Sequence, residues 1–164
     1  MRLTKNFTLY ELVKSNTSLR LGIDNTPTKE GIIKLRLLAA FLQSIRERLG
    51  PLRITSGYRS PQLSKAIGSS SNSQHCRYEA VDLQYVNRGR MDNLRIYQTI
   101  VDLDLDFDQI ILEFGDSTEY NDPMRPAWIH LSWKVSDNRR QVLVAYKDEN
   151  NKTKYRPLIE YKSL

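Results

Sequence analysis

The feature that most constrains the fold is a change in the spacing of apolar residues about one third of the way along the chain. Between residues 26 and 50 the apolar side chains recur every three or four positions, as on one face of a helix: Ile32, Ile33, Leu35, Leu38, Ala39, Leu42 and Ile45. We expect this helix to begin near Thr26-Pro27-Thr28 and to end at Gly50-Pro51. Thr8 and Glu11 fit a capping box, which predicts a short helix over 8–15. Residues 16–25 are polar and typical of a turn.

From residue 52 onward the pattern favours strands. The strand candidates are 52–56, 80–84, 107–114, 127–133, 141–146 and 153–159, the last two forming a hairpin closed at Asn150-Asn151. A helix is expected over 91–103, a loop with about one helical turn over 57–73, and a long loop over 115–126. The order of elements predicts an α+β fold with N-terminal helices packed on a small, mainly antiparallel sheet. We expect one domain over 1–164, with a helical part (1–50) and a sheet part (51–164).

Composition excludes several classes of protein. The 164 residues are 40% hydrophobic and 27% charged, which is typical of a globular chain. A single cysteine excludes an intramolecular disulfide framework and a cysteine-rich zinc site. We see no signal peptide and no apolar run long enough to cross a membrane, so we expect synthesis in the cytoplasm and no membrane insertion.

The net charge of +6 favours an anionic polymer as partner, such as nucleic acid or bacterial cell wall. Aromatic and basic residues are not interleaved, and there is no helix-turn-helix signature, so we expect no nucleic-acid binding.

The chain has only two histidines, and both lie where a strand is expected nearby. His75 ends a polar loop before the 80–84 strand, and alternation places Asp82 on the face opposite Val81 and Leu83. In the 127–133 strand, alternation groups His130 with Trp128 and Ser132.

The 107–114 strand adds a carboxylate to this region. Its alternation puts Ile110, Leu112 and Phe114 on one face and Gln109, Ile111 and Glu113 on the other. If this strand pairs with 127–133, Glu113 comes to lie beside His130. Two imidazoles and one carboxylate form a catalytic zinc set that leaves a position open for water, and Glu113 is placed to take that water's proton.

Spacing alone does not overturn the simpler interpretation that each of these residues is an ordinary polar side chain. Cys76 is a rival thiolate ligand. Because adjacent side chains tend to point to opposite sides, we expect Cys76 to be a small buried residue instead.

Several ordered motifs resemble the zinc D-alanyl-D-alanine carboxypeptidase family, which includes bacterial cell-wall peptidases and phage endolysins. Ser73-x-His75, Ala80-x-Asp82 and Trp128-x-His130 resemble its ligand motifs. The similarity runs from about Phe7 to Trp133 through four further motifs: Phe7-Thr8-Leu9-x-Glu11-Leu12, Gly22-Ile23-Asp24-Asn25-x-Pro27, Ile54-Thr55-Ser56-Gly57-Tyr58-Arg59-Ser60-Pro61 and Phe107-Asp108-Gln109-Ile110-Ile111-x-Glu113.

The resemblance implies a zinc DD-peptidase or hedgehog-like fold and a zinc ion held by His75, Asp82 and His130. It implies that Arg59 approaches substrate, and a guanidinium suits recognition of a carboxylate or a polarised carbonyl. Ser73, Gln74 and Trp128 are further candidates for substrate contact. The resemblance also implies a catalytic carboxylate, for which we choose Glu113, with Glu79 and Glu119 as alternatives.

The chain departs from the family pattern at two positions. In some relatives the catalytic carboxylate stands three residues before the last histidine, where this chain has Ala127. The family commonly has glycine three residues after the first histidine, where this chain has Tyr78. If that position needs a positive φ, tyrosine is strained there, and we then expect the loop to differ from the family's.

The resemblance therefore implies a monomeric, zinc-dependent peptidase that hydrolyses peptidoglycan stem peptides, as a carboxypeptidase or an endopeptidase, at the cell wall after release by a phage or as part of a virion. The alternative is a zinc-stabilised cell-wall-binding or virion module without turnover.

Overall fold

The computed structural model describes residues 1–115 and 124–158. These residues form five helices: α1 (Leu9–Val13), α2 (Asn16–Leu21), α3 (Lys29–Leu49), α4 (Pro61–Ala66) and α5 (Leu94–Asp102). They form seven strands: β1 (Leu52–Ser56), β2 (Ala80–Asn87), β3 (Arg90–Met91), β4 (Gln109–Gly115), β5 (Pro126–Ser132), β6 (Gln141–Lys147) and β7 (Thr153–Pro157). The α+β class expected from the sequence is confirmed. Among the helices of these ranges, none combines the length and apolarity that a membrane span requires.

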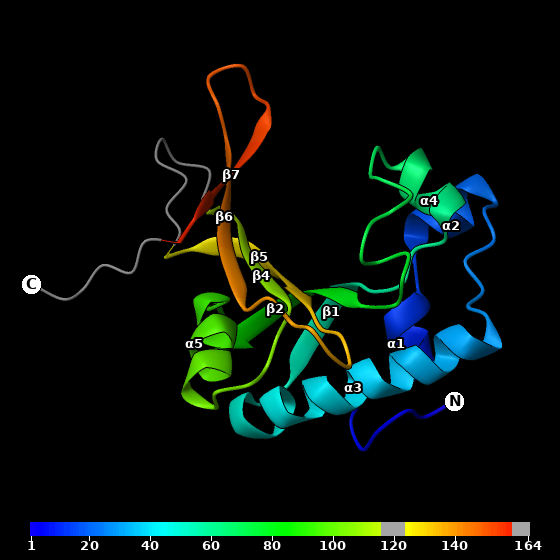
Figure 1. Ribbon diagram of the computed structural model, residues 1–164, viewed down its shortest axis with the longest axis horizontal. Coiled ribbons are helices and arrows are strands. Elements are labelled where there is room, and N and C mark those ends of the chain that lie inside the picture. Colours follow the sequence, from blue (N-terminus) through cyan, green and yellow to red (C-terminus); the bar gives the residue numbers. More distant parts are fainter. Residues whose placement is uncertain (116–123, 159–164) are drawn as a thin grey trace, which may run out of the picture.

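The strands form one sheet in the order β1-β2-β5-β4-β6-β7, with the short β3 paired to β2 (Figure 1). Neighbouring strands run antiparallel except β4 and β6, which are parallel. Strand β5 runs antiparallel to β4 and ends at the edge of the sheet where β4 begins. The chain then crosses to the other side of β4, so β6 starts at that same edge and runs parallel to β4. This topology places β2, β5 and β4 side by side in the middle of the sheet.

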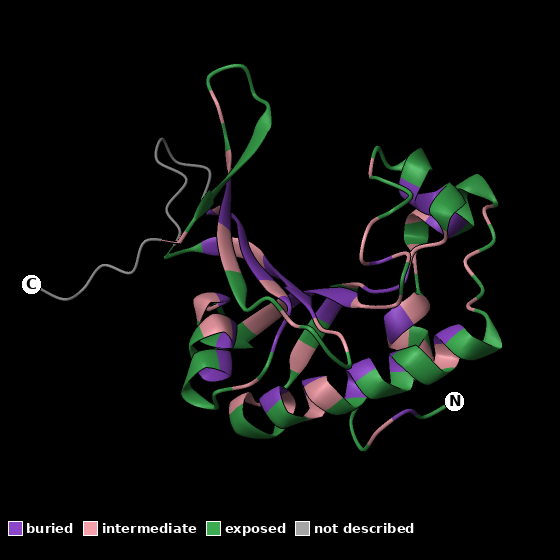
Figure 2. Ribbon diagram, in the orientation of Figure 1, coloured by how far each residue is buried: buried purple, intermediate pink, exposed green. Residues whose placement is uncertain are grey.

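The core lies between one face of the sheet and the helices α3 and α5 (Figure 1). Most of the stripe that the helical spacing predicts is buried on α3, including Leu35, Leu38, Leu42 and Ile45. The predicted member Ile33 is instead 63% exposed. The strands contribute their alternate residues to the same core, and the buried segments run through the middle of the sheet in Figure 2. The opposite face of β2, β5 and β4 is thereby left for polar side chains.

Two predicted segments differ from the structure. Residues 16–25 are not simply a turn, because Asn16–Leu21 forms α2, which the Ser15 side chain caps and Gly22 ends at φ 62°. The helix expected over 91–103 begins only at Leu94, because Arg90–Met91 pairs with the end of β2.

The predicted alternation of the third strand fails at its end. Phe114 has a left-handed backbone (φ 40°), and its ring lies 5.5 Å from that of Trp128 rather than in the core. A positive φ turns the side chain out of the strand's alternation, which sequence spacing does not reveal.

Tyr78 has the positive φ that the family pattern suggests for its position. Its φ is 65°, and its ring stacks on Tyr58 with the centroids 4.2 Å apart. The Tyr78 hydroxyl accepts a hydrogen bond from the backbone N–H of Thr28, at the start of α3. The ring passes over Gly31, where a Cβ would lie 2.3 Å from the Tyr78 Cζ. The glycine of α3 thus makes room for a tyrosine that fastens the segment after His75 to the helix.

We expect Gly31→Ala to destabilise the protein by about 1–3 kcal/mol, as overpacking does, although alanine normally favours a helix over glycine by about 1 kcal/mol. The same substitution in a Tyr78→Gly background is the matched control, and there it should stabilise. Denaturant unfolding of the wild type, Gly31→Ala, Tyr78→Gly and the double variant measures both effects. Stabilisation by Gly31→Ala in the wild-type background would contradict this packing.

Candidate metal centre

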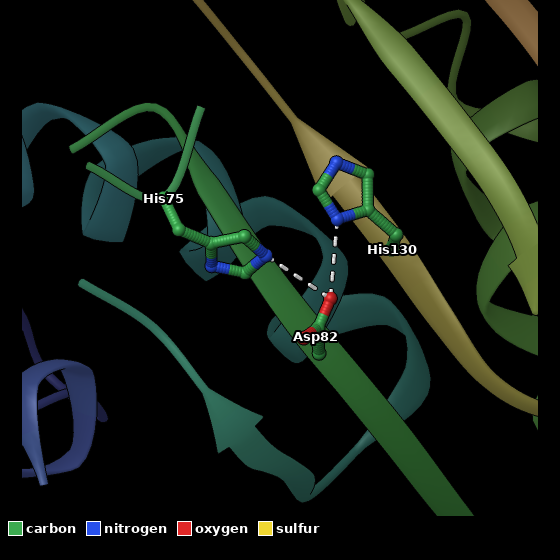
Figure 3. A group of neighbouring side chains, drawn as sticks. All are labelled: His75, Asp82 and His130. Carbon is green, nitrogen blue, oxygen red and sulfur yellow. Dashed lines mark hydrogen bonds and ion pairs between the residues drawn. The ribbon is translucent and has the colours of Figure 1, made fainter. Parts of the chain in front are cut away.

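Asp82 and His130 face each other across the pairing of β2 and β5. They are directly opposite in the register, between the pairs Val81↔Leu131 and Leu83↔Ile129. All four of those apolar neighbours are buried on the core side, so alternation directs Asp82 and His130 to the other face. The Nδ1 of His130 lies 3.1 Å from Oδ1 of Asp82 (Figure 3).

His75 reaches the same carboxylate from the loop before β2. Its Nε2 lies 3.3 Å from Oδ1 of Asp82 (Figure 3), while its Nδ1 lies 2.7 Å from the carbonyl oxygen of Gly57. A carbonyl only accepts hydrogen bonds, so Nδ1 carries the proton and Nε2 presents a lone pair. Burial lowers the pKa of His75 and outweighs the favourable effect of Asp82, which keeps the imidazole neutral.

The geometry of this cluster fits a bound cation. A neutral His75 leaves no proton between Nε2 and the Asp82 oxygen, so two lone pairs face each other. Burial opposes ionisation of Asp82, but the hydrogen bond from His130 outweighs it and lowers the pKa of the carboxyl. Arg59 also donates to this carboxylate, which fits its ionised form.

One ligand atom from each of His75, Asp82 and His130 can be chosen so that all lie within 4.8 Å of one another. Zinc bonds of about 2.0–2.1 Å at tetrahedral angles place neighbouring ligand atoms about 3.3 Å apart. The two histidine-to-Asp82 separations match that edge, and the Gly57 carbonyl supplies the outer hydrogen bond that fixes a ligating imidazole.

Arg59 holds the second oxygen of Asp82. Its Nη2 lies 2.7 Å from Oδ2 and 3.2 Å from Nε2 of His75, and its Nε donates to the Ser56 hydroxyl. These contacts leave Oδ1 of Asp82 facing both histidines. They use three of the five guanidinium donors, so donors remain for a substrate oxygen.

Glu113 lies on the same face of the sheet as His130. In the β4–β5 register Glu113 pairs with Trp128, and the pair Ile111↔His130 lies two residues away. This is the pairing of the two strands that was expected to bring Glu113 beside His130. Burial raises the pKa of Glu113 to about 7, and the charge of Asp82 adds to the effect, while His130 and Arg59 oppose it. The carboxyl is therefore able to gain and lose a proton near neutral pH.

The other predicted site residues line one cavity of about 590 Å³ together with the cluster. Arg59, Ser73, Gln74 and Trp128 all contribute to its wall, as does Glu113. The Ser73 hydroxyl also accepts a hydrogen bond from the backbone N–H of His75. The structure thus brings every predicted site residue to a single cavity.

The alternative residues are placed differently. Cys76 is half-buried rather than buried, with Sγ 3.9 Å from the carbonyl oxygen of Ser70, and it is outside the metal-compatible group. Glu79 accepts a hydrogen bond from the Arg77 guanidinium, with which it forms an ion pair, and it is not part of the cavity wall. Glu119 lies outside the described residues, as does most of the 115–126 loop.

Nine residues of the described cavity wall were not among the predicted site residues: Ser69, Asn72, Arg77, Asp108, Gln109, Ile111, Lys134, Arg139 and Tyr155. Asp108 is fully buried and ion-paired with both Lys134 and Arg139. A carboxylate between Phe107 and the apolar run of β4 could have signalled that cations must converge there, because a buried charge requires partners. Tyr155 gave no comparable signal.

Comparison with known proteins adds one match. A family model described as peptidase M15 matches residues 5–107, more than half of the chain. The matched range contains Arg59, His75 and Asp82 but ends before Glu113 and His130. No curated protein matches the chain.

We expect Zn²⁺ to stabilise the protein in thermal unfolding. At a free concentration of 100 times the dissociation constant, a ligand of the folded state adds about 2.7 kcal/mol, or roughly 5–10 °C for a chain of this size. His130→Ala should abolish the shift, whereas Cys76→Ser, outside the cluster, should retain it. An equal shift for wild type and His130→Ala would contradict a site at this cluster.

Proposed function

The chain belongs to the peptidase M15 family, and on this premise we propose that it is a zinc-dependent peptidase that hydrolyses the peptide stems of peptidoglycan. The observation that carries the proposal is the cluster of His75, Asp82 and His130 in one cavity with Glu113, whose pKa lies near neutrality. These residues all come from one chain, so the proposal requires no second subunit.

Each residue has a role that follows from its surroundings. His75, Asp82 and His130 would hold the metal, which when bound supplies Lewis-acid polarisation of a carbonyl and a water of lowered pKa. Glu113 accepts a proton from the attacking water and returns it to the departing amine. Arg59 donates to the substrate's carbonyl or carboxylate with the donors that Asp82 and Ser56 leave free.

Two features support peptidoglycan as the substrate. The net charge of +6 favours accumulation of the protein at an anionic cell wall. The cavity is lined largely by charged and hydrogen-bonding side chains, which suits a short polar peptide better than an apolar chain. We therefore propose that the protein acts at the bacterial cell wall, on a stem or cross-bridge peptide bond.

We expect Glu113→Gln to lower kcat on purified peptidoglycan by about 10²–10⁴-fold, because the amide cannot accept the proton. Zinc binding and thermal stability should remain close to wild type, because Glu113 lies outside the ligand cluster. Mass spectrometry of the released fragments measures the rate and identifies the bond. Chelation of the metal should stop release of the same fragments, and added Zn²⁺ should restore it.

The alternative is a zinc-stabilised wall-binding or virion module without turnover. Wild-type protein that binds zinc but releases no fragment from several wall chemotypes would support that alternative and overturn the peptidase. If fragments are released but Glu113→Gln releases them at the wild-type rate, the peptidase stands and another group is the base.

The proposed role of Glu113 also fixes the sign of a pH dependence. Only the ionised carboxylate accepts a proton, so kcat/KM should fall as pH drops through the pKa of Glu113. Without metal this pKa is about 7. A bound cation nearby favours ionisation, so the acid limb of the loaded enzyme should lie below 7. A profile that rises toward acid pH would contradict the assignment of Glu113 as base.

A further inference from the structure

A second charged cluster lies beside the proposed metal centre. Asp108, fully buried just before β4, contacts Arg139 through Nη2 at 2.6 Å and Lys134 through Nζ at 3.1 Å. The side-chain amide of Gln74 donates to the same carboxylate at 2.8 Å. Both cations belong to the wall of the cavity that contains His75, Asp82 and His130.

The position of this cluster relative to the metal centre follows from the chain. Gln74 immediately precedes His75, and the hydroxyl of Ser132, two residues after His130 on the same face, lies 3.5 Å from Oδ2 of Asp108. Two residues along a strand span about 6.8 Å. The contacts of Gln74 and Ser132 with Asp108 therefore place the cations in the same cavity wall, a few residues of an extended peptide from a carbonyl at the metal centre.

The cluster carries an excess of positive charge. Two cations share one carboxylate, and the side chains of Arg139 and Lys134 are 50% and 30% exposed, whereas that of Asp108 is 1% exposed. Asp108 contacts Nε and Nη2 of Arg139, which orients the guanidinium and leaves its Nη1 out of this pair. Burial opposes ionisation of Asp108, but hydrogen bonds from Arg139, Gln74 and Lys134 outweigh it and hold the pKa of Asp108 well below its usual range.

The wall of the cavity as a whole also carries a net positive charge. In the described part of the chain its wall contains four cationic side chains (Arg59, Arg77, Lys134 and Arg139) and three carboxylates (Asp82, Asp108 and Glu113). A divalent metal at the cluster of His75, Asp82 and His130 would add further positive charge. A ligand that fits this cavity is expected to be an anion.

We propose that Arg139 and Lys134 form a subsite that binds a free carboxylate of the peptide substrate close to the scissile bond. Arg139 supplies planar donors and Lys134 a point charge, and Asp108 is the positioning residue that orients them. The proposal rests on the peptidase function and extends it, because it names the group by which the substrate is selected. Two carboxylates of a stem peptide lie close to a candidate scissile bond: the C-terminal one, and the α-carboxylate of a γ-linked D-glutamate.

The test uses two matched pairs of substrates with the zinc-loaded protein. The first pair is acetyl-L-Lys-D-Ala-D-Ala and its C-terminal amide. The second pair is a stem peptide containing L-Ala-γ-D-Glu with a free α-carboxylate, and the same peptide with that carboxylate amidated. We expect the carboxylate form of one pair to be preferred by about 10–100-fold in kcat/KM, the range for a charge-assisted contact. The pair that shows the preference identifies the carboxylate.

Arg139→Gln and Lys134→Gln should each reduce this preference toward one. Arg140→Gln is the matched control: it is the next residue along, equally exposed and paired with Asp104, but outside the cavity wall. It should keep the preference. Arg139→Gln removes one of the two cations that neutralise the buried Asp108 carboxylate, so the single variant could fail to fold. In that case the double variant Asp108→Asn with Arg139→Gln tests whether the carboxylate preference is lost.

Two outcomes would overturn the subsite: no preference in either pair for wild type, or a preference that survives both cation substitutions. Binding of the same peptides to zinc-loaded Glu113→Gln, measured by calorimetry, separates this from failure of the proposed function. A carboxylate preference in binding without any hydrolysis by wild type would retain the subsite and reject the peptidase. Hydrolysis by wild type without a preference for the carboxylate form would retain the peptidase and reject the subsite.

Discussion

The site depends on the register between β2 and β5. Asp82 is opposite His130, and the residues on either side of each are buried in the core. A slip of one residue would turn Asp82 and His130 inward and their apolar neighbours outward, so burial of the core also fixes the metal-binding face. Glu113 follows from the same constraint, because β4 pairs with β5 in a register that leaves it on the His130 face. Three of the proposed functional side chains are therefore positioned by the packing that stabilises the fold.

His75 is the ligand that no strand positions, and a chain of contacts replaces the strand. Its ring is oriented by the carbonyl of Gly57. Gly57 in turn lies against the Leu12 carbonyl at the end of α1, where a Cβ would come within 2.2 Å. Tyr58, the next residue, stacks on Tyr78. Tyr78, at a position of positive φ, is therefore compatible with the metal-binding cluster. Its stacking on Tyr58 and the hydrogen bond from the Thr28 N–H hold the segment after His75 in place, and His75 still reaches Asp82.

The sequence predicted what alternation and local spacing control. The faces of Asp82, His130 and Glu113, the long helix and the α+β class follow from the periods of the apolar residues. The Asp108 cluster could not be predicted as a site in the same way, because Lys134 and Arg139 come from a crossover whose path only the sheet order reveals. The orientation of Phe114 was mispredicted because its left-handed backbone breaks the alternation of the strand. Helix α2 was missed because Ser15 at its N-terminus and Gly22 at its C-terminus cap a helix in a segment whose composition is typical of a turn. The alternative base Glu119 falls outside the described residues, so only chemistry can compare it with Glu113.

Among the described residues, three carboxylates share the cavity, and their surroundings give each a different proton affinity. Asp82 and Asp108 are buried among donors and cations, and those contacts lower both pKa values despite the cost of desolvation. Glu113 is dominated by desolvation instead, and its pKa rises to about 7. Fixed charge suits a metal ligand or an anchor for cations, whereas a group that exchanges protons near neutrality suits a base. The same physical difference therefore separates the three proposed roles: Asp82 for the metal, Asp108 for the substrate-binding cations, and Glu113 for proton transfer.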